Sequence, residues 1–201
     1  MKYIKSNFHD ILRLYINQIG ITIFSLMLYI ACGFTEEEAL FSRLRTAVSV
    51  FSVLFLFVLL YYIAWEDGAK DKIRIDGGRI SPRPYRGFLN GLLANIPNVV
   101  LGLVTLFFSI FCCLGAEWSK AGFSLLYLFT SWHAAMYMGI IQTSFYGSSI
   151  PNTDVPDYGK YLGMTIAFLL VPLISSLVTH IGYTLGSKEK KIFGFLSSKN
   201  K

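Results

Sequence analysis

The amino-acid sequence predicts an all-α, polytopic integral membrane helix bundle with four or five transmembrane helices. Two observations predict this fold. Apolar residues make up 54% of the 201 residues and charged residues only 15%, whereas soluble domains contain about 25% charged residues. All charged side chains also lie outside five windows, residues 14–35, 46–65, 87–116, 121–153 and 161–187. A helix needs about 20 mostly apolar residues to cross about 30 Å of hydrocarbon, so each window is long enough to span a bilayer.

We interpret the whole chain as a single membrane domain. The predicted hydrophobic spans cover residues 14–34, 46–65, 88–114, 121–141 and 161–185. The longest polar segment between them, residues 66–86, is too short to form a second folded domain. The three cysteines lie in or beside the apolar windows without metal-ligand spacing, and we interpret them as small apolar fillers. They are Cys32, Cys112 and Cys113.

The first half of the chain contains two predicted spans and their polar flanks. Residues 2–13 place basic side chains on one helical face and apolar side chains on another, which predicts a headgroup-level helix leading directly into the first span. Asn17 and Gln18 lie near the start of that span. A short loop is expected over residues 36–45, before the second span. Beyond that span, alternation over residues 72–75 followed by Asp-Gly-Gly predicts a small β-hairpin.

The other three spans contain features that disturb a regular transmembrane helix. The third contains Asn95-Ile96-Pro97-Asn98, and proline removes a backbone donor and crowds the preceding turn, so we expect a kink or a break there. Pro172 predicts a similar disturbance in the fifth span. The fourth span is the least apolar, with His133 near its centre.

The distribution of lysine and arginine favours an even number of crossings. Three basic residues precede the first span, six lie in residues 66–86 and five lie in the C-terminal tail. These fourteen of the eighteen basic residues share one side only if the number of crossings is even, and the positive-inside rule makes that side cytoplasmic. One window would then be re-entrant or interfacial, and the fourth ranks ahead of the third because polar side chains in its centre are costly in lipid.

Polar residues inside the predicted spans are the candidate functional positions. His133 and Tyr137 share one helical face of the fourth span, and His180 and Tyr183 share one face of the fifth. Asn95 and Asn98 flank the expected break in the third span. Such residues line a cavity or, more commonly, form hydrogen bonds between helices. The sequence contains no recognisable set of catalytic, metal-binding or cofactor-binding residues, and any cofactor is unknown.

These features favour a small transport-related or permease-like component of a plasma membrane, which we expect to be bacterial. The alternative is a non-catalytic membrane interaction or immunity-type protein. In that interpretation the basic residues 66–86 and pairs of glycines four positions apart would contact a membrane-protein partner or a second copy. The lipid bilayer is the expected partner in either case. Nucleic acid is not, because the basic residues lie between hydrophobic spans.

A third interpretation follows from a partial resemblance. Glu37-Glu38 followed by Arg43, then Phe129 and His133 four positions apart, resembles the motifs of the membrane-embedded CAAX-type proteases, with His180 as the later histidine. The resemblance implies that glutamate and histidine activate a water molecule. Arg43 comes one position later than the arginine of the family motif, which turns it by about 100° on a helix. The protease interpretation therefore ranks third.

Overall fold

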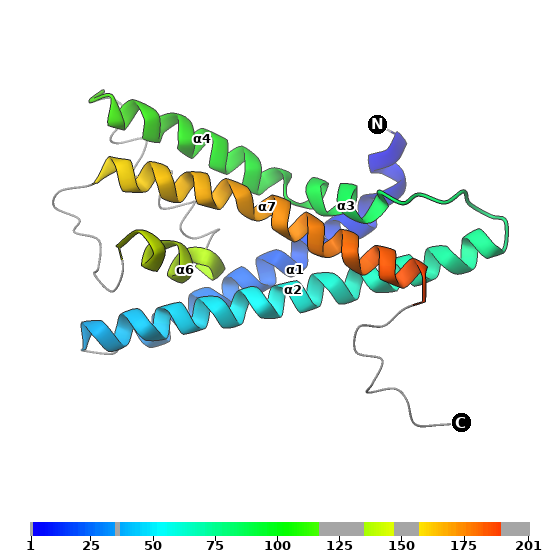
Figure 1. Cartoon of the computed structure of the whole chain (residues 1–201), viewed down its shortest axis with the longest axis horizontal. Coiled ribbons are helices and arrows are strands. Elements are labelled where there is room, and N and C mark those ends of the chain that lie inside the picture. The colour runs from blue at the N-terminus through cyan, green and yellow to red at the C-terminus, as the bar shows by residue number, and fades with distance from the viewer. Residues whose placement is uncertain (1, 35–36, 117–134, 147–156, 190–201) are drawn as a thin grey trace. The chain divides into compact units, whose positions relative to one another are not determined.

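The computed structural model describes residues 2–34, 37–116, 135–146 and 157–189, and every regular element in these ranges is a helix. Four of the described helices, α1, α2, α4 and α7, are long and apolar enough to cross a membrane. The predicted all-α membrane bundle is therefore confirmed. The helices are α1 (Lys2–Cys32), α2 (Glu38–Asp76), α3 (Arg86–Ala94), α4 (Ile96–Cys113), α6 (Ala135–Tyr146) and α7 (Tyr158–Ser187) (Figure 1).

Most of the fourth predicted span, residues 121–141, lies outside the described residues, which resume with α6. The described part of this helix has 12 residues. That the fourth window is re-entrant or interfacial stays a prediction.

The long helices turn apolar side chains outward and small polar side chains inward. Leu54, Val58 and Leu170 are each more than half exposed, whereas Ser52 and Ser176 are completely buried. Most of the remaining buried polar side chains are also serine, threonine or amide residues. Lipid contacts an apolar surface without penalty, and polar side chains in a bilayer need protein partners, so this distribution is typical of a membrane-embedded bundle.

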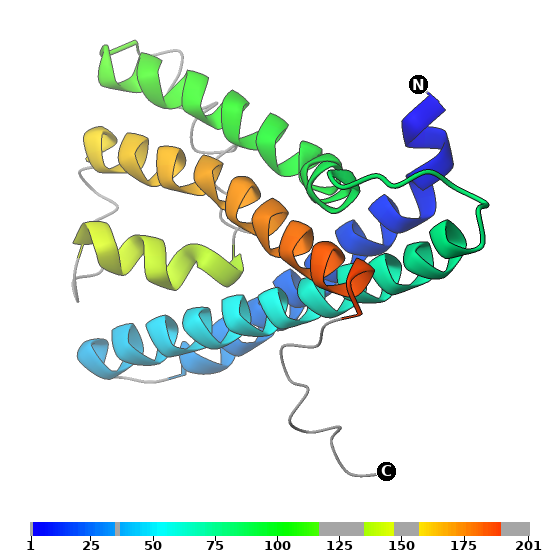
Figure 2. The same ribbon diagram turned by 45° about the vertical axis from the view of Figure 1, so that its right-hand side comes forward.

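The chain forms two compact units, each with segments from distant parts of the sequence. The first unit comprises Met1–Leu14, Phe57–Ala94 and Leu173–Lys201, and the second comprises Tyr15–Leu56 and Asn95–Pro172. Helices α1, α2 and α7 are unbroken and contribute residues to both units (Figures 1 and 2). In the first unit, the N-terminal part of α1 therefore packs with α3 and the C-terminal parts of α2 and α7.

The predicted β-hairpin after the second span is wrong, because α2 continues as a helix to Asp76. Ion pairs between residues three or four positions apart stabilise this extension, including Glu66 with Lys70 and Lys72 with Asp76. Two residues beyond Asp76, the chain turns out of the helical path at Gly78, whose φ of 66° is readily adopted only by glycine. The N–H of Arg79 donates to the carbonyl of Arg74 at 2.9 Å, which completes the cap.

The expectations for the preceding segments are partly confirmed. Helix α1 runs without interruption from Lys2 to Cys32, as predicted for an N-terminal helix leading directly into the first span. The predicted loop over residues 36–45 is mostly wrong, because α2 begins at Glu38 and contains Arg43 and Arg45. Arg43 and Arg45 lie in the first turns of α2, because the helix begins before the apolar window does.

The predicted break in the third span is confirmed, whereas the disturbance predicted at Pro172 is not observed. Helix α3 ends at Ala94 and α4 starts at Ile96, with Pro97 in its first turn. The Nδ2 of Asn98 donates to Asn95 Oδ1 at 3.0 Å, a local bond of the kind that competes with the helical ladder. Helix α7, by contrast, continues through Pro172.

Glycines of α7 permit close packing against α2 in the first unit. A Cβ atom at Gly182 would lie 2.5 Å from the carbonyl oxygen of Tyr61, and a Cβ atom at Gly186 would lie even closer to the carbonyl oxygen of Trp65. Contacts this short leave no room for a methyl group. The close helix approach expected from glycines four positions apart therefore occurs at this pair.

We predict that Gly182→Ala destabilises the bundle by about 1–3 kcal/mol, because the added methyl group forces α7 away from α2. Thermal unfolding in detergent, followed by circular dichroism, measures the change. Gly20→Ala is the matched control, since a Cβ at Gly20 meets no atom within 4 Å. Equal melting temperatures for the two variants would contradict the packing argument.

Candidate functional site

Four helices of the first unit meet around the guanidinium group of Arg86, the first residue of α3. Its Nη2 donates to Asp10 Oδ2 of α1 at 2.6 Å, and its Nη1 donates to Asp71 Oδ2 of α2. The hydroxyl of Tyr183 in α7 donates to the same Asp71 oxygen at 2.7 Å. Asp71 is only 1% exposed. A buried, hydrogen-bonded ion-pair network thus joins α1, α2, α3 and α7.

The surroundings of Arg86 keep its guanidinium group charged. Burial by itself lowers the pKa of Arg86, but the hydrogen bond to Asp71 and the negative charges of Asp71 and Asp10 raise this pKa above its ordinary value. Both carboxylates therefore have a permanent counter-charge. Removal of one partner from a buried ion pair leaves an uncompensated charge, which costs about 3–5 kcal/mol.

A cavity of about 220 Å³ lies beside this network. Glu66 accepts from Arg13 and from Lys70, both at 2.7 Å. Two other ion pairs are long, since Arg13 Nη1 to Asp67 Oδ1 and Arg74 Nη1 to Asp71 Oδ1 are each 3.9 Å. The cavity therefore contains both signs of charge, and its charges are unequally paired. Its acidic residues are Asp10, Asp67 and Asp71, its basic residues are Arg13, Lys70, Arg74 and Arg86, and His9 completes the lining.

The polar stripe predicted on the fifth span contacts α3. Thr179 Oγ1 donates to the carbonyl of Gly87 at 3.0 Å and can also bond the carbonyl of Ser176 at 2.8 Å. Tyr183 is 4% exposed and bonds Asp71. These side chains form hydrogen bonds within and between helices, which is the commoner of the two roles considered for them.

Of the two histidines predicted as candidate positions, His180 lies within the described residues. His180 of α7 lies between two aromatic rings, stacked on Tyr85 at 6.5 Å and edge-on to Phe88 at 6.4 Å between ring centroids. Its Nδ1 is buried without a hydrogen bond to any described residue. His133 lies outside the described residues. Its predicted companion Tyr137 is buried in α6 of the second unit.

Three amide side chains form a buried cluster in the second unit, at the start of α4. Asn98 Nδ2 donates to Asn95 Oδ1 at 3.0 Å and to Gln18 Oε1 of α1 at 3.3 Å. The three residues are 8%, 2% and 3% exposed, respectively. Within the described part of the chain, Asn98 Oδ1 is buried and accepts no hydrogen bond. The cluster therefore has an unfilled acceptor where the third predicted span is broken.

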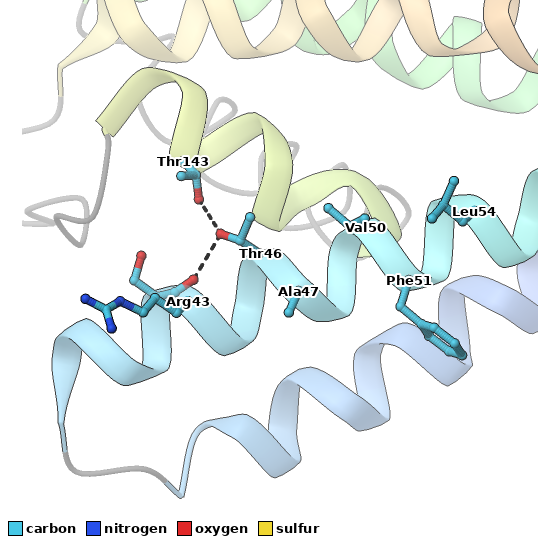
Figure 3. A pocket seen from close by; sticks show the side chains of 8 residues that line it. Arg43, Thr46, Ala47, Val50, Phe51, Leu54 and Thr143 are labelled. Carbon is cyan, nitrogen blue, oxygen red and sulfur yellow. Dashed lines mark hydrogen bonds between the residues drawn. The ribbon is translucent and has the colours of Figure 1, made fainter.

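An apolar groove of about 730 Å³ lies in the second unit, along the N-terminal half of α2. Figure 3 shows the hydroxyls of Thr46 and Thr143 joined by a hydrogen bond of 2.7 Å, with α6 beside α2. Ser49 adds a bond to the carbonyl of Met136 at 2.7 Å. Apolar side chains dominate the lining and Arg43 is its only charged residue, so the groove lacks the converging polar groups of a reactive site. The lining residues are Ser42, Arg43, Thr46, Ala47, Val50, Phe51, Leu54 and Thr143.

The described residues contain no group of three or more histidine, cysteine or acidic side chains that could hold a metal ion. The three cysteines are free thiols. Of the residues that carry the protease resemblance, Glu37 is exposed just before α2, His180 lies between Tyr85 and Phe88, and His133 is outside the described ranges. The protease interpretation stays a prediction.

The Arg86 network was not among the positions that the sequence singled out. Asp10, Asp71 and Arg86 lie in polar flanks of the apolar windows, and charged residues there are usually solvated. One signal was available, because aspartates interrupt two of the most basic segments of a chain with a net charge of +6. No sequence pattern, however, relates residues that are 15 and 76 positions apart to one another.

Comparison with known proteins finds no similarity that identifies the chain, since no protein-family model, no curated protein and no solved structure matches it.

We predict that Arg86→Gln lowers the free energy of unfolding by about 3–5 kcal/mol, because it leaves Asp10 and Asp71 without their counter-charge. The melting temperature of the purified protein in detergent measures this loss. Arg79→Gln is the matched control, since Arg79 is exposed just beyond the end of α2.

Combining Arg86→Gln with Asp10→Asn and Asp71→Asn tests whether the stability loss of Arg86→Gln comes from the two uncompensated carboxylates. The triple variant removes the unpaired charges and is expected to regain part of the lost stability. Two results would contradict the assigned role of the network. One is a melting temperature for Arg86→Gln equal to that of Arg79→Gln, and the other is a triple variant that melts at a lower temperature than Arg86→Gln alone.

Proposed function

We propose that this chain is a small transport-related membrane component whose solute site is the amide cluster of Gln18, Asn95 and Asn98. The observation behind the proposal is the coincidence of this buried polar cluster with the break between α3 and α4. Discontinuous helices in transporters place backbone ends and polar side chains around a site within the membrane. A break also costs backbone hydrogen bonds, so its position beside the unsatisfied Oδ1 of Asn98 favours a role in binding.

The chemistry of the cluster suggests which solutes to test first. All three side chains are neutral amides, which offer carbonyl oxygens as ligands and N–H groups as donors. They lie in charge-free windows of the sequence. Such a site matches a neutral polar solute, or a monovalent cation that prefers oxygen ligands, better than a multivalent ion that requires compensating charge.

The same proposal includes an orientation with both ends of the chain in the cytoplasm. The first unit contains the N-terminal part of α1 and the C-terminal parts of α2 and α7. If these helix ends share one side of the membrane, three segments with fourteen of the eighteen basic residues face the cytoplasm. Helices α1, α2, α4 and α7 would then be the four complete crossings.

We predict that the protein, reconstituted into vesicles, increases the flux of at least one small probe above that of protein-free vesicles. Tracer uptake measures sodium and rubidium, and light scattering after an osmotic shift measures urea and glycerol. We expect Asn98→Leu to reduce the flux about tenfold or more, because it removes both the donor of the cluster and its unfilled acceptor. His180→Ala in the same assay tests the sequence prediction for that histidine.

Val100→Leu is the matched control for Asn98→Leu, since Val100 is an exposed residue of the same helix. Both variants are first compared for melting temperature, so that a loss of flux is not mistaken for unfolding. No flux for any probe, or equal flux in Asn98→Leu and the control, would assign the cluster to helix packing. The interaction-type alternative would then rank first.

We predict that a green fluorescent protein fused after Lys201 is fluorescent, since this reporter folds on the cytoplasmic side. Alkaline phosphatase inserted at Asn152 is expected to be active, because this enzyme requires the outer side. Exchange of the two reporters is the control for expression level. Active phosphatase at Lys201 would contradict the four-crossing orientation.

A further inference from the structure

The cavity beside Arg86 has two charged side chains, Asp67 and Arg74, that form only long ion pairs. Charge-assisted hydrogen bonds are usually about 2.7–2.9 Å long. Within the described ranges, Asp67 and Arg74 make no side-chain hydrogen bond, and the ion pair of each is 3.9 Å long. By contrast, Arg86 bonds two aspartates and Glu66 bonds two basic residues. One carboxylate and one guanidinium group of the cavity thus have free hydrogen-bonding capacity.

These two groups lie on the same face of α2. Asp67 and Arg74 are seven residues apart, which returns to the same face after about two turns. Arg74 reaches back along the helix, since its Nη1 is 3.9 Å from Asp71, which is one turn beyond Asp67. The separation between the two free charges is therefore about one helical turn, or about 5 Å. A small ligand with one positive and one negative group can bridge such a distance.

The cavity residues adjoin the ends of three apolar windows, which is the depth expected for lipid headgroups. Arg13 immediately precedes the first charge-free window, Asp67 follows the second by two residues, and Arg86 immediately precedes the third. At 1.5 Å per residue these positions are only a few ångströms from the ends of the apolar segments. The headgroup region occupies about 5–8 Å on either side of the hydrocarbon core. Phospholipid headgroups are therefore the most abundant small zwitterions at this site.

We propose that the cavity binds the ammonium–phosphate zwitterion of an ethanolamine phospholipid, with the ammonium group at Asp67 and the phosphate group at Arg74. The ammonium group donates hydrogen bonds to the Asp67 carboxylate, which is 14% exposed. The phosphate accepts from the Arg74 guanidinium group, whose side chain is 57% exposed. Arginine forks match phosphate oxygens geometrically as well as electrostatically.

The same geometry accounts for selection among headgroups. A choline headgroup has the phosphate and the positive charge, but its methylated nitrogen has no N–H to donate to Asp67. A glycerol headgroup is only negative, and Asp10, Asp67 and Asp71 oppose additional negative charge in the cavity. Ethanolamine is the common headgroup that satisfies both ends.

Isothermal titration calorimetry of the full-length protein in detergent tests the proposal with short-chain dihexanoyl lipids. We expect a lower Kd for dihexanoyl phosphatidylethanolamine than for the phosphatidylcholine and phosphatidylglycerol analogues. Asp67→Asn should weaken ethanolamine-lipid binding by about tenfold or more, because a charge-assisted hydrogen bond is lost. It should weaken binding of the choline lipid much less, since that headgroup makes no hydrogen bond to Asp67, and general destabilisation would not produce this difference.

Arg74→Gln is the second variant, because the Arg74 side chain is more than half exposed and its replacement is expected to leave the fold intact. This substitution should weaken the binding of all three lipids, since each has a phosphate group. Arg79→Gln is the control for removal of a nearby positive charge and should bind as the unchanged protein does.

Soluble phosphoethanolamine distinguishes the source of the ligand. Binding of the lipid but not of phosphoethanolamine identifies a lipid site, and equal affinity identifies a site for the free zwitterion; both outcomes support the proposed recognition. Equal Kd values for the three lipids, or unchanged ethanolamine-lipid binding in Asp67→Asn, would overturn it. Neither result depends on the flux experiment, because the amide cluster consists of different residues.

Discussion

The interaction of Arg86 with Asp10 and Asp71 is the one on which the organisation of the first unit depends. Three helices contribute these charges, and a fourth contributes Tyr183 to the same aspartate. A partly dehydrated charge can be tolerated only if its partners are in place. The position of α3 is consequently determined at its first residue, and the glycines that follow are brought against Thr179 of α7.

Outside this network, a different constraint governs the bundle. Lipid tails are as apolar as leucine, so burial of leucine side chains contributes little to helix association within a membrane. Small residues that permit close approach and polar residues that need partners take that role, as at Gly182 and Ser49. Leu56 and Leu60 are fully buried, but much of the apolar surface of α2 points outward. The burial pattern is therefore reversed relative to a soluble domain.

The two candidate sites differ in chemistry because they lie in different surroundings. The cavity of the first unit is lined by charged groups that adjoin the ends of the apolar windows. The cluster of the second unit contains only amides, within windows that have no charge at all. A neutral site is the less costly way to hold polar atoms inside a membrane.

The sequence by itself determined the class of fold and the break near Pro97, because charge segregation and proline act locally along the chain. The sequence-based prediction was wrong for residues 72–80. Their alternation suggested strands, but α2 extends to Asp76 and is stabilised there by an ion pair between residues one turn apart. The sequence also named Asn95, Asn98 and Tyr183 as polar positions without indicating their partners. Only the tertiary structure decided that Asn98 meets Gln18 and that Asp10, Asp71 and Arg86 form one network. The physical reason is that these contacts depend on which helix faces pack together, and helices far apart in sequence leave no local signal of their pairing.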